Sequence, residues 1–216
     1  MKPVDYSLYL VTDAELSHGR SQRQIVEAAI RGGVTFVQYR EKSASTRHMI
    51  EEAFDLCQLC RTYGVPFIIN DRLDVALAVD ADGVHVGQDD MPAALARKLI
   101  GPSKILGVSV ENGTQLQAAM TDGADYVGAS PIFATPTKPD APPPMGLRGL
   151  RQLSEHAVIP IVAIGGLNAS NAADVLRAGA SGLAVVSAIV SAEDVEAAAR
   201  MLKQIIEENR SQKGAF

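Results

Sequence analysis

Short apolar runs recur eight times along this chain, and each of them ends in polar residues or glycine. The runs are rich in Val and Ile, show little alternation, and are separated by segments of helical periodicity. Strands of this kind are typical of a parallel sheet that is covered on both faces. The sequence predicts strands at approximately 7–12, 34–39, 66–70, 83–86, 105–109, 125–128, 160–164 and 182–187.

Helices are expected between and after these strands. Eight β/α units in 216 residues leave no room for a second domain. The count therefore favours a closed (β/α)8 TIM barrel, a single domain over 1–216, rather than an open doubly wound sheet. The predicted helices lie near 21–31, 46–62, 73–79, 91–100, 112–122, 147–156, 168–178 and 193–208.

Glycine and asparagine mark the ends of several predicted helices. Gly32-Gly33, Gly123 and Gly179 each follow a helix, where a left-handed cap is often needed. Asn112 and Asn168 stand where N-caps are expected after the fifth and seventh strands.

Charge and hydropathy exclude some partners. The formal net charge is −5, so a general basic field for nucleic acid is absent, and any anionic small molecule must be bound by local positive groups. We expect no membrane span, because no run of about 18 apolar residues occurs. The first residues lack the pattern of a signal peptide, which predicts a cytoplasmic location. A homo-oligomer is compatible with the sequence.

Two cysteines, Cys57 and Cys60, have the CxxC spacing of some redox and metal sites. They fall late in a predicted helix, however, whereas a reactive CxxC normally gains thiolate character at a helix N-terminus. Residues three apart share one face of a helix. We therefore favour two small packed side chains over a redox or metal site.

One connection, from 131 to 150, carries six of the 11 prolines. An interdomain linker is one interpretation, but the β/α alternation resumes afterwards and is needed to close the barrel. A long loop inside a compact domain is more often functional. We expect an active-site loop at about 131–149, stiffened by proline, whose chemistry comes from Thr135, Thr137 and Lys138.

Active sites of such barrels lie at the carboxyl ends of the strands, where the polar clusters of this chain fall. The strongest is Gln38-Tyr39-Arg40-Glu41-Lys42. Arg40 and Lys42 could hold a phosphate, with arginine contributing a bidentate fork. A solvated charge run is the alternative, and the neighbouring clusters favour the phosphate.

Acidic residues follow the third and fourth strands, in Asn70-Asp71-Arg72 and in Asp89-Asp90. Each could begin a helix, but together they bring carboxylates to the ends of adjacent strands. Mg²⁺ is typically bound by one or two carboxylates with waters and phosphate oxygens of the substrate. Beside Arg40, Lys42 and Lys138, the acids indicate Mg²⁺ and a diphosphate.

A second phosphate signal comes from Gly165-Gly166 after the seventh strand and Val186-Ser187 after the eighth. The loops at these two positions form the usual phosphate site of a TIM barrel, through backbone N–H groups. His85 lies within the fourth strand and is interpreted as a packed, hydrogen-bonded histidine. Thr12-Asp13 is interpreted as structural support of the rim.

Several motifs, in this order, resemble those of the thiamine phosphate synthase family: YLVTD, QYREK, INDR, GVHVGQDD, GVSV, TPTK, AIGG and VVSA. The resemblance covers about residues 6–190. It implies a Mg²⁺-dependent transferase on a TIM barrel, which joins 4-amino-2-methyl-5-hydroxymethylpyrimidine diphosphate to 4-methyl-5-(2-phosphoethyl)thiazole and releases pyrophosphate. Both partners are small phosphorylated substrates.

The resemblance also implies roles for residues. Asp71 and Asp90 would hold Mg²⁺, and Arg40, Lys42 and Lys138 would stabilise the departing diphosphate. The pyrimidine diphosphate would be bound by Gln38, Tyr39, Arg40, Glu41, Lys42, Asn70, Ser109 and Lys138. The thiazole phosphate would be bound by Thr135, Pro136, Thr137, Gly166, Val186 and Ser187.

Two other functions compete with this one. A thiazole tautomerase on the same barrel would need a proton shuttle, usually histidine, rather than paired metal acids. A non-catalytic phosphate-binding protein would not need the leaving-group residues. The family mechanism is dissociative, because the diphosphate departs before the thiazole nitrogen captures the pyrimidine cation, and this explains a rim rich in anion ligands.

Overall fold

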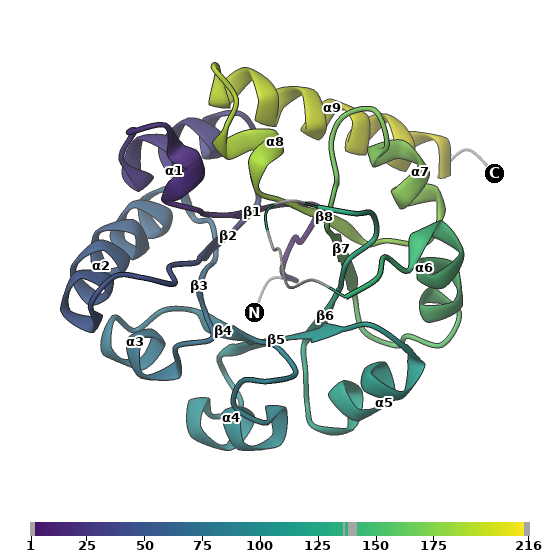
Figure 1. Cartoon of the computed structure of the whole chain (residues 1–216), viewed down its shortest axis with the longest axis horizontal. Helices are drawn as coiled ribbons and strands as arrows, with labels where there is room; N and C mark the ends of the chain where they lie inside the picture. The colour runs from purple at the N-terminus through teal and green to yellow at the C-terminus, as the bar shows by residue number, and fades with distance from the viewer. Residues whose placement is uncertain (1–2, 136, 138–141, 214–216) are drawn as a thin grey trace.

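The eight expected strands all form, and they close into one parallel barrel in their order along the chain (Figure 1). We describe a computed structural model of the chain, over residues 3–135, 137 and 142–213. Strand β1 pairs with both β2 and β8, which closes the ring and confirms the (β/α)8 barrel. The strands are β1 (Leu8–Val11), β2 (Phe36–Tyr39), β3 (Phe67–Asn70), β4 (Gly83–Val86), β5 (Ile105–Val110), β6 (Tyr126–Ala129), β7 (Ile161–Ile164) and β8 (Gly182–Val185).

Helices surround the barrel on its outside (Figure 1). The longer ones are α1 (Gln22–Arg31), α2 (Thr46–Tyr63), α3 (Leu73–Ala78), α4 (Ala93–Ile100), α5 (Gly113–Thr121), α6 (Gly146–Ser154), α7 (Ala172–Arg177) and α9 (Val195–Lys213). Two short helices were not expected from the sequence, η1 (Glu15–Ser17) after β1 and α8 (Ser187–Val190) after β8. Both lie in loops that follow strands, where three or four residues show no helical periodicity.

Local capping explains where several helices begin. Ser21 and Gln24 form a reciprocal capping box at the start of α1. Asn112 caps α5 as expected, since its side chain accepts from the Gln115 amide. The expectation for Asn168 was wrong: α7 begins at Ala172, and Asn168 instead accepts from the Ser170 amide and closes a turn.

Alternation along the strands produces two apolar layers. Leu8 and Leu10 of β1 point outward and join the core between strands and helices, which also contains Cys57 and Cys60. Tyr9 and Val11 point inward and join the smaller cluster that fills the barrel. Burial raises the pKa of both thiols, which agrees with packed rather than redox cysteines.

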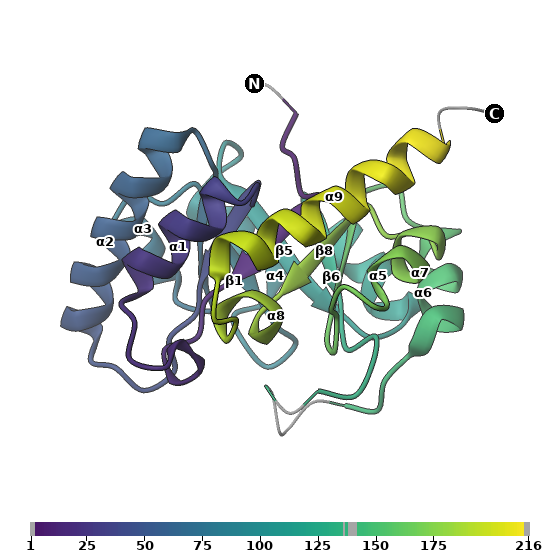
Figure 2. The same ribbon diagram turned by 90° about the horizontal axis from the view of Figure 1, so that it is seen from above.

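The two ends of the barrel differ in what they carry. The chain enters from the far side of the view in Figure 1, whereas the described residues of the β6–α6 connection lie at the near side, where the strands end (Figure 2). This near face holds the loops that follow each strand. Within the described residues, the structure contains no helix of the length and apolarity that a membrane crossing requires.

Candidate active site

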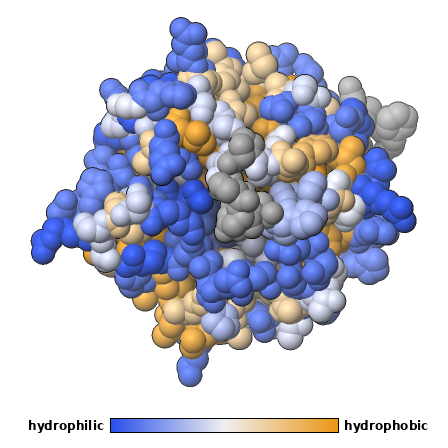
Figure 3. Space-filling model, viewed as in Figure 1, coloured by the Kyte–Doolittle hydropathy of each residue, from blue (hydrophilic) through white to orange (hydrophobic). Residues whose placement is uncertain are grey.

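A cavity of about 510 Å³ opens at the carboxyl ends of the strands. Each strand or the loop after it contributes to its lining, and the surface around the barrel mouth is mostly hydrophilic (Figure 3). Its volume is that of a small-molecule site. Many of the predicted site residues line it: Gln38, Arg40, Lys42, Asn70, Asp71, Asp90, Ser109, Thr135, Thr137, Gly166, Val186 and Ser187. Pro136 and Lys138 lie outside the described residues.

The side chains of Tyr39 and Glu41 lie outside this lining. Tyr39 alternates with Gln38 along β2, so its ring packs in the outer core and its hydroxyl donates to Glu52 at 2.8 Å. Glu41 accepts from the amides of Ser43 and Ala44 and shapes the turn after β2. The structure therefore places neither side chain in the cavity, in contrast to the expectation for these two residues.

Arg40 is held at the rim by residues that follow β1. Its guanidinium lies 3.1 Å from the Asp13 carboxylate, and its amide donates to the Thr12 hydroxyl at 3.0 Å. The other oxygen of Asp13 accepts from the Leu16 amide, which fixes the carboxylate. Thr12 and Asp13 therefore support the rim, as the sequence led us to expect, and they orient one cation in particular.

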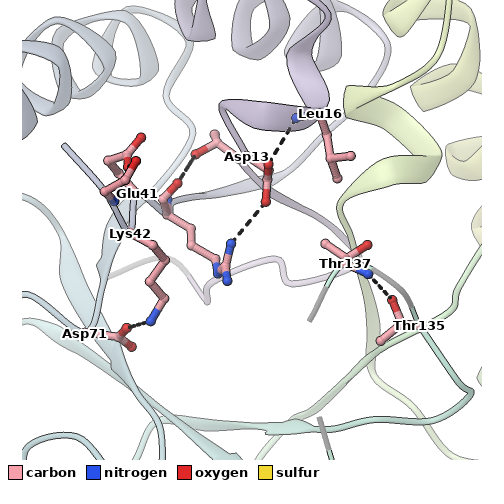
Figure 4. A network of polar contacts seen from close by, with 10 residues as sticks. Asp13, Leu16, Glu41, Lys42, Asp71, Thr135 and Thr137 are labelled. Atoms are coloured by element: carbon pink, nitrogen blue, oxygen red, sulfur yellow. Dashed lines mark hydrogen bonds and ion pairs between the residues drawn. The ribbon is translucent and has the colours of Figure 1, made fainter. Parts of the chain in front are cut away.

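Lys42 and Asp71 face each other across the ends of β2 and β3, 2.5 Å apart (Figure 4). Burial raises the pKa of Asp71, and the neighbouring Asp90 carboxyl raises it further, although Lys42 acts in the opposite direction. Asp71 and Asp90 are thus close enough to interact. A pair of carboxylates beside one lysine is suited to a cation that compensates the second negative charge.

Backbone contacts set where the two acids point. Asp71 adopts a left-handed conformation with φ of 60°, and its amide donates to the His85 carbonyl of β4. Asp90 accepts from the Gly87 amide at 2.7 Å, which turns its carboxylate back towards β4. Neither side chain caps the following helix. Both Asp89 and Asp90 are exposed, but only Asp90 lines the cavity, so the structure separates the roles of the two adjacent acids.

On the opposite side of the cavity, the first residues of the proline-rich loop lie against the end of β7. The Ile132 amide donates to the Ile164 carbonyl, and the Phe133 amide donates to the Gly165 carbonyl. Gly166 has φ of +66°, and a Cβ there would lie 2.7 Å from the Ala134 carbonyl oxygen. Only glycine therefore allows β7 to end so close to this loop.

Thr135, Thr137 and the start of α8 complete this side. The Thr137 amide donates to the Thr135 hydroxyl at 3.3 Å, which bends the loop into the cavity mouth (Figure 4). Val186 precedes α8 and Ser187 begins it. The first amides of a helix have no acceptor within the helix, so this position offers N–H groups to an anion.

The cavity wall contains side chains that the sequence did not assign to the site, among them Tyr9, Tyr126 and His85. Sequence reasoning treated His85 as a packed, hydrogen-bonded residue, and the structure confirms both features. The available signal was the two-residue alternation, which turns Tyr9 to the same face as Val11. The structure was needed to show that the three side chains touch.

The chain matches the protein-family model described as thiamine monophosphate synthase over residues 8–189. It is 66% identical to the thiamine-phosphate synthase of Chloroflexus aurantiacus over 203 residues, 94% of each chain. It is 52% identical to that of Syntrophomonas wolfei over 205 residues, 95% of this chain and 98% of the relative.

Solved structures agree in fold. A thiamine phosphate pyrophosphorylase from Pyrococcus furiosus superposes with a TM-score of 0.88 and 45% identity, covering 95% of this chain and 98% of that one. A 3-hexulose-6-phosphate synthase superposes with a TM-score of 0.65 at 20% identity, a likeness of the barrel alone.

Proposed function

We propose a reaction site and a mechanism for this chain, which belongs to the thiamine monophosphate synthase family and condenses a pyrimidine with a thiazole moiety. In this proposal the reaction takes place in the cavity described above, with Mg²⁺, by departure of diphosphate from the pyrimidine. The substrates in this proposal are 4-amino-2-methyl-5-hydroxymethylpyrimidine diphosphate and 4-methyl-5-(2-phosphoethyl)thiazole. The products are thiamine phosphate and pyrophosphate.

One observation carries this proposal: a single cavity has two unlike sides. Arg40, Lys42, Asp71 and Asp90 line one side, as expected for a metal-bound diphosphate. Thr135, Thr137, Gly166 and Ser187 line the other, where backbone amides and hydroxyls suit a monophosphate. Two anions bound at opposite sides place the reacting carbon and nitrogen between them.

The residues on the first side fit Mg²⁺. Burial raises the pKa of Asp71 and the neighbouring Asp90 carboxyl adds to this, while Lys42 is the one cation paired with Asp71 among the described residues. The described residues hold no cluster of three or more acidic, His or Cys side chains that could enclose an ion. Mg²⁺ keeps several waters and uses one or two carboxylates with substrate phosphates, so this proposal needs only the two acids Asp71 and Asp90.

When bound, Mg²⁺ would neutralise charge on the leaving diphosphate as a Lewis acid. Arg40 and Lys42 supply fixed positive charge to the same oxygens, and Asp13 keeps the Arg40 guanidinium in place. Lys138, named from the sequence, belongs to this proposed set. Orientation of the thiazole nitrogen towards the pyrimidine carbon supplies much of the remaining acceleration, up to roughly 7–11 kcal/mol in favourable systems.

The thiazole side has a positioning role. Gly166 and the start of α8 would hold the phosphate, and the loop residues Thr135 and Thr137 would close over it, with Pro136 between them. We propose that this loop keeps water away from the cation that forms when the diphosphate leaves. The hydrogen bonds that join Ile132 and Phe133 to β7 support a loop seated against the cavity.

The test is a two-substrate assay that detects pyrophosphate. We expect release only when both substrates and Mg²⁺ are present, and its loss with EDTA. Asp90→Asn should lower kcat strongly and raise the Mg²⁺ concentration needed for half-maximal rate. Asp89→Asn is the matched control, because it removes the same charge one residue away. Turnover undiminished by EDTA would refute the metal assignment.

The tautomerase alternative has little support in the cavity. Burial lowers the pKa of His85 to about 4, so its imidazole is a poor proton acceptor, and Ser109 stands between its Nε2 and the cavity. A binding protein without catalysis is disfavoured by the family assignment.

A further inference from the structure

A chain of hydrogen bonds crosses the inside of the barrel at the cavity wall. It joins side chains from five strands, β2, β1, β6, β4 and β5, so it runs from one side of the ring to the other (Figure 1). The bonds link Gln38 Nε2 to Tyr9 Oη (2.5 Å), Tyr9 Oη to Tyr126 Oη (2.8 Å), Tyr126 Oη to His85 Nδ1 (2.8 Å) and His85 Nε2 to Ser109 Oγ (2.9 Å).

Two glycines leave the space that this chain needs. A Cβ at Gly107 would lie 2.3 Å from Tyr126 Oη and 2.4 Å from His85 Nδ1, the two atoms of one hydrogen bond. A Cβ at Gly128 would lie 3.1 Å from His85 Cε1. Any larger residue at Gly107 would displace the Tyr126–His85 contact. The strands are thus built around the chain of hydrogen bonds.

Each bond fixes the direction of the next. The Gln38 amide nitrogen can only donate, so Tyr9 accepts and its own hydrogen is left for Tyr126. Tyr126 then donates to His85 Nδ1, which requires the hydrogen of the neutral ring to lie on Nε2. Nε2–H donates to Ser109, whose hydroxyl hydrogen remains free for the cavity.

The groups in the middle are held neutral. Burial raises the pKa of both Tyr9 and Tyr126, so neither phenol ionises near neutral pH. Burial lowers the pKa of His85 to about 4. A neutral chain has one hydrogen for each bond, so the middle residues tie the hydrogen-bonding direction at Ser109 to that at Gln38.

We propose that Tyr9, Tyr126 and His85 are positioning residues that fix the hydrogen-bonding polarity of Gln38 and Ser109 towards the aminopyrimidine. This rests on the proposed function. With the direction above, Gln38 presents its carbonyl oxygen as an acceptor, and Ser109 presents a donor. An aminopyrimidine carries the complementary groups, an amino N–H donor and ring nitrogen acceptors. An oxo analogue carries them reversed, so the chain would select against it.

The first test needs no substrate. We expect ¹⁵N-histidine NMR of the free protein to show His85 with hydrogen on Nε2 and a bare Nδ1, with its signals assigned by their loss in His85→Gln. Hydrogen on Nδ1 would mean that the chain runs in the opposite direction, and this would overturn the proposal whether or not the enzyme is active.

The second test is kinetic. Tyr126→Phe removes the central link, and we expect KM for the pyrimidine diphosphate to rise about tenfold, as for one lost hydrogen bond. The ratio of kcat/KM for the amino substrate to that for its 4-oxo analogue should fall by a similar factor. Intrinsic reactivity of the two compounds cancels when this ratio is compared between variants.

Tyr6→Phe is the matched control. Its ring packs 4.7 Å from that of Tyr126, but its hydroxyl has no hydrogen-bond partner among the described residues and lies outside the cavity lining. His85→Gln retains an acceptor and a donor and should recover most of the preference, whereas His85→Leu should not. If Tyr6→Phe and Tyr126→Phe lose the amino preference equally, or if folded Tyr126→Phe keeps it, the proposal is wrong.

Failure of the proposed function would look different. A wild-type protein that forms no thiamine phosphate would refute the activity, while the His85 tautomer would still report the direction of the chain. If Tyr126→Phe does not fold, as judged by thermal melting, the His85→Gln and His85→Leu pair still separates hydrogen bonding from packing, because Leu is close in size to the side chain that it replaces.

Discussion

At the scale of single residues, the cations of this site are positioned by acids that the substrate never needs to touch. Asp13 holds Arg40 from β1, while Lys42 pairs with Asp71, one of the two acids that we propose as Mg²⁺ ligands. The two pairs differ in exposure, since the Asp13 side chain is only 11% exposed and that of Lys42 is 56% exposed. Solvent and salt therefore weaken the Asp13–Arg40 pair less than the Lys42–Asp71 pair, and its side chains are the more rigidly held.

Asp13→Asn tests this positioning role. Asparagine keeps an oxygen for the Leu16 amide but cannot accept from Arg40 at its other end. A hydrogen bond to a charged group contributes about 1.5–3 kcal/mol. We expect kcat/KM for the pyrimidine diphosphate to fall about 10- to 100-fold.

Asp55→Asn is the control, because the Arg23–Asp55 pair is a surface pair with both side chains about half exposed. It should leave both kinetics and the melting temperature nearly unchanged. Equal activity of Asp13→Asn and the wild type would show that Asp13 does not position Arg40 for the reaction.

At the scale of elements, the end of β7 and the loop after β6 form one unit. The Ile132 and Phe133 amides donate to carbonyl groups at the end of β7. The loop also occupies the space that a side chain at Gly166 would need. The sequence predicted a phosphate site at Gly165-Gly166 from its place in the fold. It did not predict that the same glycines carry the loop, because this needs the distance between two segments about 30 residues apart in the chain.

Gly166→Ala and Gly64→Ala separate backbone strain from function. Both glycines have φ of +66°, so alanine costs about 1–2 kcal/mol at either position. No described atom lies within 4 Å of a Cβ at Gly64, whereas at Gly166 a Cβ would strike the loop.

We expect both variants to melt at lower temperature, and only Gly166→Ala to raise KM for the thiazole phosphate. Steady-state kinetics with one substrate varied at a time would show this. An equal effect of both variants on KM would mean that the loop is not seated through Gly166.

At the scale of the whole molecule, closure of the ring is what makes one cavity from eight strand ends. Helix α9 packs across α1 and α7, on the side where β8 meets β1. Of the Gly32-Gly33 pair, which was expected to supply a left-handed cap after α1, Gly33 does so with φ of +105°, whereas Gly32 has φ of −76°. Gly32 is small because a Cβ there would lie 2.4 Å from the Glu196 carbonyl oxygen and 2.6 Å from Ala199 Cβ.

Gly32→Ala should therefore loosen α9. Overpacking of this kind costs about 1–3 kcal/mol, and each kcal/mol lowers Tm by about 2–4 °C in a chain of this size. Gly113→Ala has open space around its Cβ and should change Tm little. Thermal melts of both variants would decide this, and kcat/KM well below Tm should be unchanged in both. A Tm for Gly32→Ala equal to that of the wild type would contradict tight packing of α9 against α1.

The sequence by itself determined the barrel, the order of its elements and many of the polar residues at the cavity rim, because a two-residue or 3.6-residue period and a polar strand end are local properties of the chain. Tertiary structure alone decided which neighbours act together. Three examples are contacts between segments far apart in the chain: Asp13 with Arg40, Gly32 with α9, and Tyr9 with Tyr126 and His85. A fourth is a difference between adjacent residues, since Asp90 lines the cavity and Asp89 does not. Such contacts depend on where the backbone brings each side chain, which no local pattern records.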